Sequence, residues 1–256
     1  MQFHASETRE TYTGRAVDPS WKNWVIEHIN PKDKDILDIG CGGGIYSDGF
    51  ASLGARSVTG IDQSQQYIDD ANQRYQTIAN LHFIQSDATH IALSNACSDI
   101  IFERALIHHL TPGAQLNNGT ECYRLLRDNG LLVVQDRTLD DVLFDHQNTW
   151  IRSTLIQHFP RLPPFEKQRR PDKKAYENRL KQAGFRQIQT ITYPEIRKIY
   201  ASFEALKEEI LSRKGKSILF ELSDLELLHY CDRLEKKHPD HELIECDYWT
   251  IWLASK

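Results

Sequence analysis

A short apolar run that breaks into glycines constrains the fold more than any other feature of this sequence. Residues 34–44 read KDILDIGCGGG, a pattern typical of a buried strand that turns sharply into a helix. Glycines at such a turn leave the backbone bare, so a ligand can approach it closely. The next apolar run, residues 57–61, ends in Asp62, about twenty residues after the glycines, where related folds bind a ribose through its hydroxyls. Together these features predict an adenosine-type ligand across the tips of two neighbouring parallel strands.

The details of the turn argue against a dinucleotide as that ligand. The dinucleotide fingerprint requires a third glycine three places after Gly42, and this sequence has Ile45 there. Asp38, two residues before Gly40, would repel phosphates but suits a cationic ligand with a free amino group. A nicotinamide oxidoreductase is therefore disfavoured.

Residues 37–44 resemble the first motif of class I S-adenosylmethionine-dependent methyltransferases, and the resemblance extends over residues 34–138. It implies a three-layer α/β, Rossmann-like fold, whose seven-stranded sheet is mostly parallel with an antiparallel last strand. It also implies that S-adenosylmethionine is the cofactor. The cofactor contacts that we expect on this basis are Arg15, Asp38, Gly40, Cys41, Gly42, Asp62, Gln63, Asp87, Ala88 and Glu103.

Some of these contacts have competing interpretations. Asp87 follows the third predicted strand, residues 81–85, where the family bonds the adenine amino group, but it could instead cap a helix. Arg15 could pair with the methionyl carboxylate, and Tyr12 could reach the same end, or both could be ordinary loop residues. Glu103 and Arg104 stand where most relatives have small or amide residues, which indicates either a particular substrate or a salt bridge.

The sequence offers three candidates for catalytic groups: His108, Asp136 and Tyr12. Methyl transfer from a sulfonium depends chiefly on alignment, so the reaction does not require a fixed catalytic residue. His108 could act as a base or be a packed, hydrogen-bonded histidine. Because adjacent histidines point in different directions, His108 and His109 do not suit one metal ion, and we expect no metal. Asp136 ends the fifth predicted strand, on the side of the sheet where ligands bind.

The chain length suits one methyltransferase domain, residues 1–256, with three additions. We expect an N-terminal cap helix within residues 1–30, an insert after the fifth strand at residues 139–171, and a helical insert at residues 196–240. The last insert separates a sixth strand, residues 185–193, from a seventh, residues 245–254. Pro163 and Pro164 are expected to end a helix. The additions could converge as a lid over the ligand, although the inserts could also form surface or a dimer face.

The composition of the chain limits the classes of partner that we expect this protein to bind. The net charge is −5, without the basic face of a nucleic-acid binder, although residues 161–186 hold nine Lys and Arg against three acidic residues. The five cysteines are scattered, and we see neither a signal peptide nor a membrane span, so we expect a cytoplasmic protein. The sequence thus predicts an S-adenosylmethionine-dependent methyltransferase acting on a small molecule. Alternatives are a non-catalytic cofactor-binding or interaction protein and an RNA methyltransferase. Monomer and homodimer both stay open.

Overall fold

The chain is built around one seven-stranded sheet, in the order β3-β2-β1-β4-β5-β7-β6. The computed structural model describes residues 17–144, 149–213, 216–237 and 242–256. β1 to β5 are parallel, and β7 runs antiparallel to both of its neighbours. The predicted fold class is therefore confirmed. The strands are β1 (Asp35–Ile39), β2 (Ser57–Asp62), β3 (Leu81–Gln85), β4 (Ser98–Arg104), β5 (Leu126–Asp136), β6 (Gln187–Ile199) and β7 (Ile244–Ser255).

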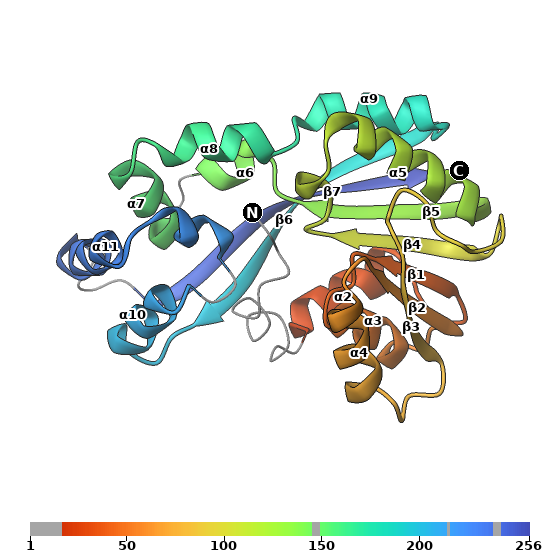
Figure 1. Ribbon diagram of the computed structural model, residues 1–256, viewed down its shortest axis with the longest axis horizontal. Helices are drawn as coiled ribbons and strands as arrows, with labels where there is room; N and C mark the ends of the chain where they lie inside the picture. Colours follow the sequence, from red (N-terminus) through yellow and green to blue (C-terminus); the bar gives the residue numbers. More distant parts are fainter. Residues whose placement is uncertain (1–16, 145–148, 214–215, 238–241) are drawn as a thin grey trace.

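Helices cover both faces of the sheet (Figure 1). One face carries α2 (Pro19–His28), α3 (Ile45–Ser52) and α4 (Gln65–Arg74), whose buried side chains Trp21, Phe50 and Ile68 belong to one apolar core. The other carries α5 (Pro112–Leu125) and α9 (Lys173–Ala183), with Cys122 and Leu180 in a second core. Such covering of both faces explains why the parallel strands are apolar along their length.

A third apolar core lies outside these layers, in what we call the helical subdomain (Figure 1). Trp150, Ile151 and Leu155 from the segment after β5 pack with Leu206 and Leu227 from the segment between β6 and β7. The two inserts thus share one core. The elements of the subdomain are α6 (Leu139–Leu143), α7 (Trp150–His158), α8 (Leu162–Arg169), α10 (Phe203–Leu211), the 3-10 helix η4 (Ser217–Glu221) and α11 (Asp224–Lys237).

β6 and β7 form a ribbon that extends past the tip of β5. The pairing of β5 with β7 ends at Asp136 opposite Thr250, whereas β6 and β7 remain paired as far as Ile199 opposite Ile244. The prediction that the sixth strand ends at residue 193 is wrong, and the first four residues of the predicted 196–240 insert are strand. Pro194 does not stop the strand because β6 is at the edge of the sheet, where a missing N–H breaks no pairing.

Two helix ends test the capping signals of the sequence. Asp18 accepts a hydrogen bond from the amide of Ser20 at 2.8 Å, and Pro19 opens α2, as predicted. The expectation that Pro163 and Pro164 end a helix is wrong, because both lie in the first turn of α8. Proline is tolerated there, since the first-turn amides have no partner within the helix. In the described part of the chain, no helix has the length and apolar character needed to cross a membrane.

Candidate cofactor and acceptor site

The turn after β1 presents bare backbone, as expected. Gly40, Gly42 and Gly44 all have positive φ, the region that favours glycine. A Cβ atom built on Gly42 would meet nothing within 4 Å, whereas one on Gly44 would come within 2.5 Å of the Phe83 ring. Gly44 is thus needed for packing, and Gly42 leaves open space in which a ligand can contact the chain.

Asp62 ties the end of β2 to this turn. Its carboxylate accepts hydrogen bonds from the amides of Gly42 and Ser64, both at 2.9 Å. The spacing argument from the sequence therefore places Asp62 correctly beside the glycines. Its neighbour Gln63 is exposed, and its carbonyl accepts a hydrogen bond from the Gln85 side chain.

Asp38 lies buried beneath the turn, with only 2% of its surface exposed. Ser47 Oγ donates a hydrogen bond to it, and in the described residues no lysine, arginine or histidine forms an ion pair with it. Burial, reinforced by the charge of Asp62, raises the pKa of Asp38 to about 7. A buried carboxylate without a cation suits a ligand that brings a positive charge. Cys41 is buried, with its Sγ near Gly60, and its thiol donates a hydrogen bond to the Gly42 carbonyl at 3.6 Å.

The adenine candidates follow β3 at the same edge of the sheet. Asp87 is exposed and accepts hydrogen bonds from the amide and hydroxyl of Thr89, which lower the pKa of its carboxyl group. Because the chain continues as a turn, the alternative that Asp87 caps a helix is wrong. The carbonyl of Ala88 accepts a hydrogen bond from Asn118.

Glu103 is not brought to the glycine turn. Its side chain is fully buried against α5, where it accepts hydrogen bonds from Asn118 Nδ2 at 2.7 Å and from Cys122 Sγ. It pairs in register with Ile39, one position beyond the pair of Asp38 with Phe102. Side chains alternate along a strand, so Glu103 and Asp38 point to opposite faces of the sheet. The contacts of Glu103 therefore do not support its expected role at the cofactor.

The sequence left open whether Arg104 contacts a substrate or forms a salt bridge. Arg104 forms an ion pair with Glu195 of β6 at 2.6 Å, and its guanidinium lies over the rings of Tyr46 and Trp249. The salt-bridge interpretation of this unusual residue is thus the one that the structure supports.

The structure joins two of the three catalytic candidates. His108 lies in the 3-10 helix η2 (Ile107–His109), and its Nδ1 is 2.8 Å from Asp136 Oδ1. Since an ionised carboxylate only accepts, Nδ1 donates this bond. Asp136 also accepts from the backbone amide of His108, so the carboxylate binds both the ring and the backbone of this residue. The third candidate, Tyr12, and the expected cofactor residue Arg15 lie outside the described residues.

The protonation states of this pair follow from its surroundings. Burial alone would raise the pKa of Asp136, but the neighbouring His108 and Arg170 hold it well below its usual range. Burial lowers the pKa of His108. The pair therefore consists of a carboxylate and a neutral imidazole, and in the described part of the chain nothing hydrogen bonds to Nε2 of His108.

Comparison with known proteins agrees with this fold. Residues 36–130 match the family model of the methyltransferase domain. The chain carries a class I S-adenosylmethionine-dependent methyltransferase domain. This family uses S-adenosylmethionine, and the bare backbone at Gly42 and the uncompensated carboxylate of Asp38 fit that cofactor.

The curated relatives match this chain over part of its length. A ubiquinone biosynthesis O-methyltransferase of Stutzerimonas stutzeri is 40% identical over 70 residues, covering 27% of this chain and 26% of the relative. One of Coxiella burnetii is 32% identical over 118 residues, covering 45% of this chain and 49% of the relative. The chain thus spans at most about half the length of these curated relatives.

Solved structures match over nearly the whole chain. A protein of Anabaena variabilis, described as a methyltransferase from an antibiotic biosynthesis pathway, has a TM-score of 0.69 at 20% identity, covering 93% of this chain and 98% of its own. A phosphoethanolamine N-methyltransferase of Haemonchus contortus has a TM-score of 0.61 at 17% identity, covering 98% of this chain and 56% of its own. At these identities the likeness concerns the fold.

Proposed function

We propose that this protein transfers a methyl group from S-adenosylmethionine to a hydroxyl oxygen of a small-molecule acceptor. The observation that carries the proposal is the buried His108–Asp136 pair at the carboxyl ends of β4 and β5. Ligands of open α/β sheets bind at this edge, beyond the strand ends. The names of the curated relatives, which are O-methyltransferases, support oxygen as the acceptor atom.

Seven of the expected cofactor residues have positions that fit a role at the cofactor. Asp62 would accept from the ribose hydroxyls, and Asp38 would neutralise the amino group. Asp87 and the backbone of Ala88 would hold the adenine, and the backbone of Gly40, Cys41 and Gly42 would line the cofactor. When bound, S-adenosylmethionine supplies a methyl group already activated by its sulfonium.

His108 would then act as the general base. Asp136 fixes its tautomer by accepting from Nδ1, which leaves the lone pair on Nε2 available for the proton of an acceptor hydroxyl. The lowered pKa of His108 keeps the imidazole neutral, and hence able to accept that proton, at neutral pH. A general base of this kind contributes about 10²–10⁴-fold in rate. Asp136, already the partner of Nδ1, stabilises the imidazolium that forms.

The contacts of the basic segment 161–186 weigh against an RNA substrate. Arg169 and Arg170 do not contribute to a basic surface, because both form ion pairs with the buried Glu166. The helical subdomain would instead border the acceptor site, since α8 brings Arg170 to within 3.6 Å of Asp136. A small acceptor between the subdomain and the strand ends fits this arrangement.

The test combines binding with turnover. The purified protein is titrated calorimetrically with S-adenosylmethionine, S-adenosylhomocysteine and NADH, then assayed against a panel of hydroxylated metabolites. We expect micromolar binding of the first two ligands and methylation of at least one acceptor. His108→Gln should lower kcat about 10²–10⁴-fold with unchanged cofactor affinity, and the exposed His82→Gln is the matched control. Cofactor binding without any turnover would instead favour a non-catalytic binding protein. An unchanged kcat in His108→Gln would rule out His108 as the general base.

A further inference from the structure

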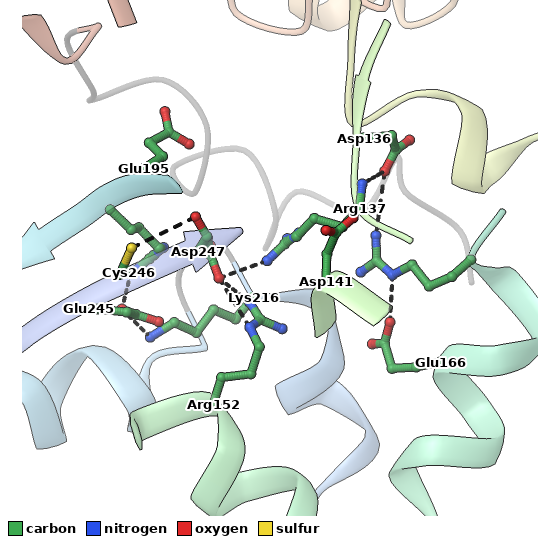
Figure 2. Close-up of polar contacts among 12 residues, drawn as sticks. Asp136, Arg137, Asp141, Arg152, Glu166, Glu195, Lys216, Glu245, Cys246 and Asp247 are labelled. Carbon is green, nitrogen blue, oxygen red and sulfur yellow. Dashed lines mark hydrogen bonds and ion pairs between the residues drawn. The ribbon is translucent and has the colours of Figure 1, made fainter. Parts of the chain in front are cut away.

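Buried charges cluster where the helical subdomain meets the strand ends (Figure 2). In the described part of the chain, five guanidinium groups there face four carboxylates. We call this set, together with the ring of Trp249, the junction cluster. Its members are Arg104, Arg137, Arg152, Arg169, Arg170, Asp136, Glu166, Glu195, Asp247 and Trp249.

Arg137 is the least compensated member of the cluster. Its Nη1 is 3.0 Å from Asp247 Oδ1, but Arg152 binds the same oxygen through Nε at 3.0 Å and Nη2 at 2.9 Å. Figure 2 shows Arg137 and Arg152 converging on Asp247. Burial, together with repulsion from Arg152 and Arg170, lowers the pKa of Arg137 to about 9. The guanidinium groups of Arg137 and Arg152 thus share one carboxylate oxygen of Asp247.

The unsatisfied atoms of the junction cluster all have the same hydrogen-bonding character. In the described residues, Arg137 Nε, Arg169 Nε and Trp249 Nε1 are buried without a hydrogen-bond partner, and Arg137 Nη1 and Arg170 Nη1 have only their ion pairs with Asp247 and Asp136. Every one of them is a donor. Leaving a buried charged donor unpaired is costly, so native proteins rarely do it without a functional reason. A set that contains only donors calls for a ligand that only accepts.

These donors surround the groups of the proposed reaction. Arg137 follows Asp136 directly and donates its backbone amide to Asp136 Oδ1 at 2.7 Å. Arg170 Nη1 is 3.6 Å from the same oxygen, and its side chain is only 2% exposed. The guanidinium of Arg137 lies over the Trp249 ring, 4.6 Å from its centroid. Asp136, which Arg170 approaches, is also the carboxylate that binds His108 Nδ1.

We propose that Arg137 and Arg170, with the indole N–H of Trp249, form a subsite for an anionic oxygen group of the methyl acceptor, either a carboxylate or a phosphate. The planar fork of arginine matches both groups. The subsite rests on the proposed transferase function, because it names the class of acceptor that the same site takes. The acceptor would thus carry a reacting hydroxyl near His108 and a negative charge at Arg137. The Arg137 side chain is 14% exposed, so part of it is accessible to a ligand.

The binding experiment uses three small probes of similar shape. Protein saturated with S-adenosylhomocysteine is titrated calorimetrically with benzoate, phenyl phosphate and the neutral benzamide, in buffer free of other carboxylates and phosphate. We expect benzoate or phenyl phosphate to bind at least tenfold more tightly than benzamide, and the tighter of the two identifies the anionic group. Equal binding of all three probes, or no binding of either anion, would overturn the subsite.

Two variants test whether the anion binds at Arg137 and Arg170. Arg137→Gln and Arg170→Gln should each weaken anion binding at least tenfold, while the Kd for S-adenosylhomocysteine stays within twofold and so reports an intact fold. The exposed Arg161→Gln, which removes an ion pair with Glu226, should change neither affinity. An unchanged anion affinity in both junction variants would overturn the assignment. If Arg137→Gln fails to fold, the comparison of the three probes on the unaltered protein still decides. Absence of methyl transfer with anion binding intact would count against the proposed function alone.

Discussion

The carboxylate of Asp62 accepts a hydrogen bond from the backbone amide of Gly42, twenty positions earlier in the chain, at 2.9 Å. This bond joins the tip of β2 to the turn after β1. Any ligand that lies along the turn therefore meets Asp62 at a fixed place. The arrangement gives the cofactor site its most direct test.

Asp62→Ala should weaken binding of S-adenosylhomocysteine about ten- to a hundredfold, because a hydrogen bond to a charged group contributes roughly 1.5–3 kcal/mol. Calorimetric titration measures the effect. Asp69→Ala, an exposed carboxylate on α4, is the matched control and should change little. An affinity unchanged by Asp62→Ala would show that the ribose lies elsewhere.

Cofactor affinity should depend on pH through Asp38. Its pKa of about 7 in the free protein means that the carboxyl group is largely protonated below neutral pH. A cationic amino group binds the ionised form, so binding below pH 7 must release a proton. The Kd for S-adenosylmethionine should therefore fall as pH rises, by up to about tenfold per unit between pH 5.5 and 7, and level off above.

Asp38→Asn provides the comparison for that titration. The amide cannot ionise, so this variant should bind more weakly at pH 8 and lose most of the pH dependence. Parallel profiles for the two proteins would show that another group titrates.

The contribution of Glu103 to the stability of the protein should fall as pH rises through the window between its unfolded and folded pKa values. Burial raises the pKa of Glu103 to about 7, from 4.5 in the unfolded chain. Between these values the folded state holds more protons than the unfolded state, so the free energy of unfolding decreases with pH. Glu103→Gln should remove this part of the slope and be the more stable protein at pH 8, by roughly 1–3 kcal/mol. Urea unfolding of both proteins at pH 5 and pH 8 tests this, and a native protein more stable than Glu103→Gln at pH 8 would contradict it.

Two leucines on α11 offer a matched test of the helical subdomain. Leu227 is fully buried in its core, whereas Leu225 is 62% exposed. Leu227→Ala should lower the free energy of unfolding by about 2–5 kcal/mol, and Leu225→Ala should stay within about 0.5 kcal/mol of the parent. Thermal and urea unfolding give both values. Equal effects would mean that the subdomain core is not packed as described.

The sequence predicted the parts of the site that depend on local spacing. The glycine turn, Asp38 and Asp62 are each fixed by one strand end, and the alternation of strands and helices along the chain brings those ends to one edge of the sheet. The His108–Asp136 bond joins residues 28 positions apart, and no local pattern shows which of several strand-end groups will meet. Both residues were candidates, but their pairing is a tertiary property.

Other features depended on long-range pairing that the sequence does not display. The length of β6 follows from its register with β7, so the alternation before Pro194 could not reveal that the strand continues to Ile199. The ion pair of Arg104 with Glu195 spans 91 positions. Glu103 was expected at the cofactor because of its place in the chain, but a strand residue one position from the ligand-facing side chain points to the opposite face.

The ribbon of β6 and β7 is part of the sheet and also connects the sheet to the helical subdomain. One end lies beside β5 in the sheet, and beyond the other end α10 follows β6 in the chain and α11 precedes β7. Because the two strands stay paired as far as Ile199 and Ile244, bending or twisting of the ribbon would also displace α10 and α11. The ribbon is thus anchored in the sheet at one end. Its stiffness depends on the backbone hydrogen bonds that join residues 193–199 of β6 to β7.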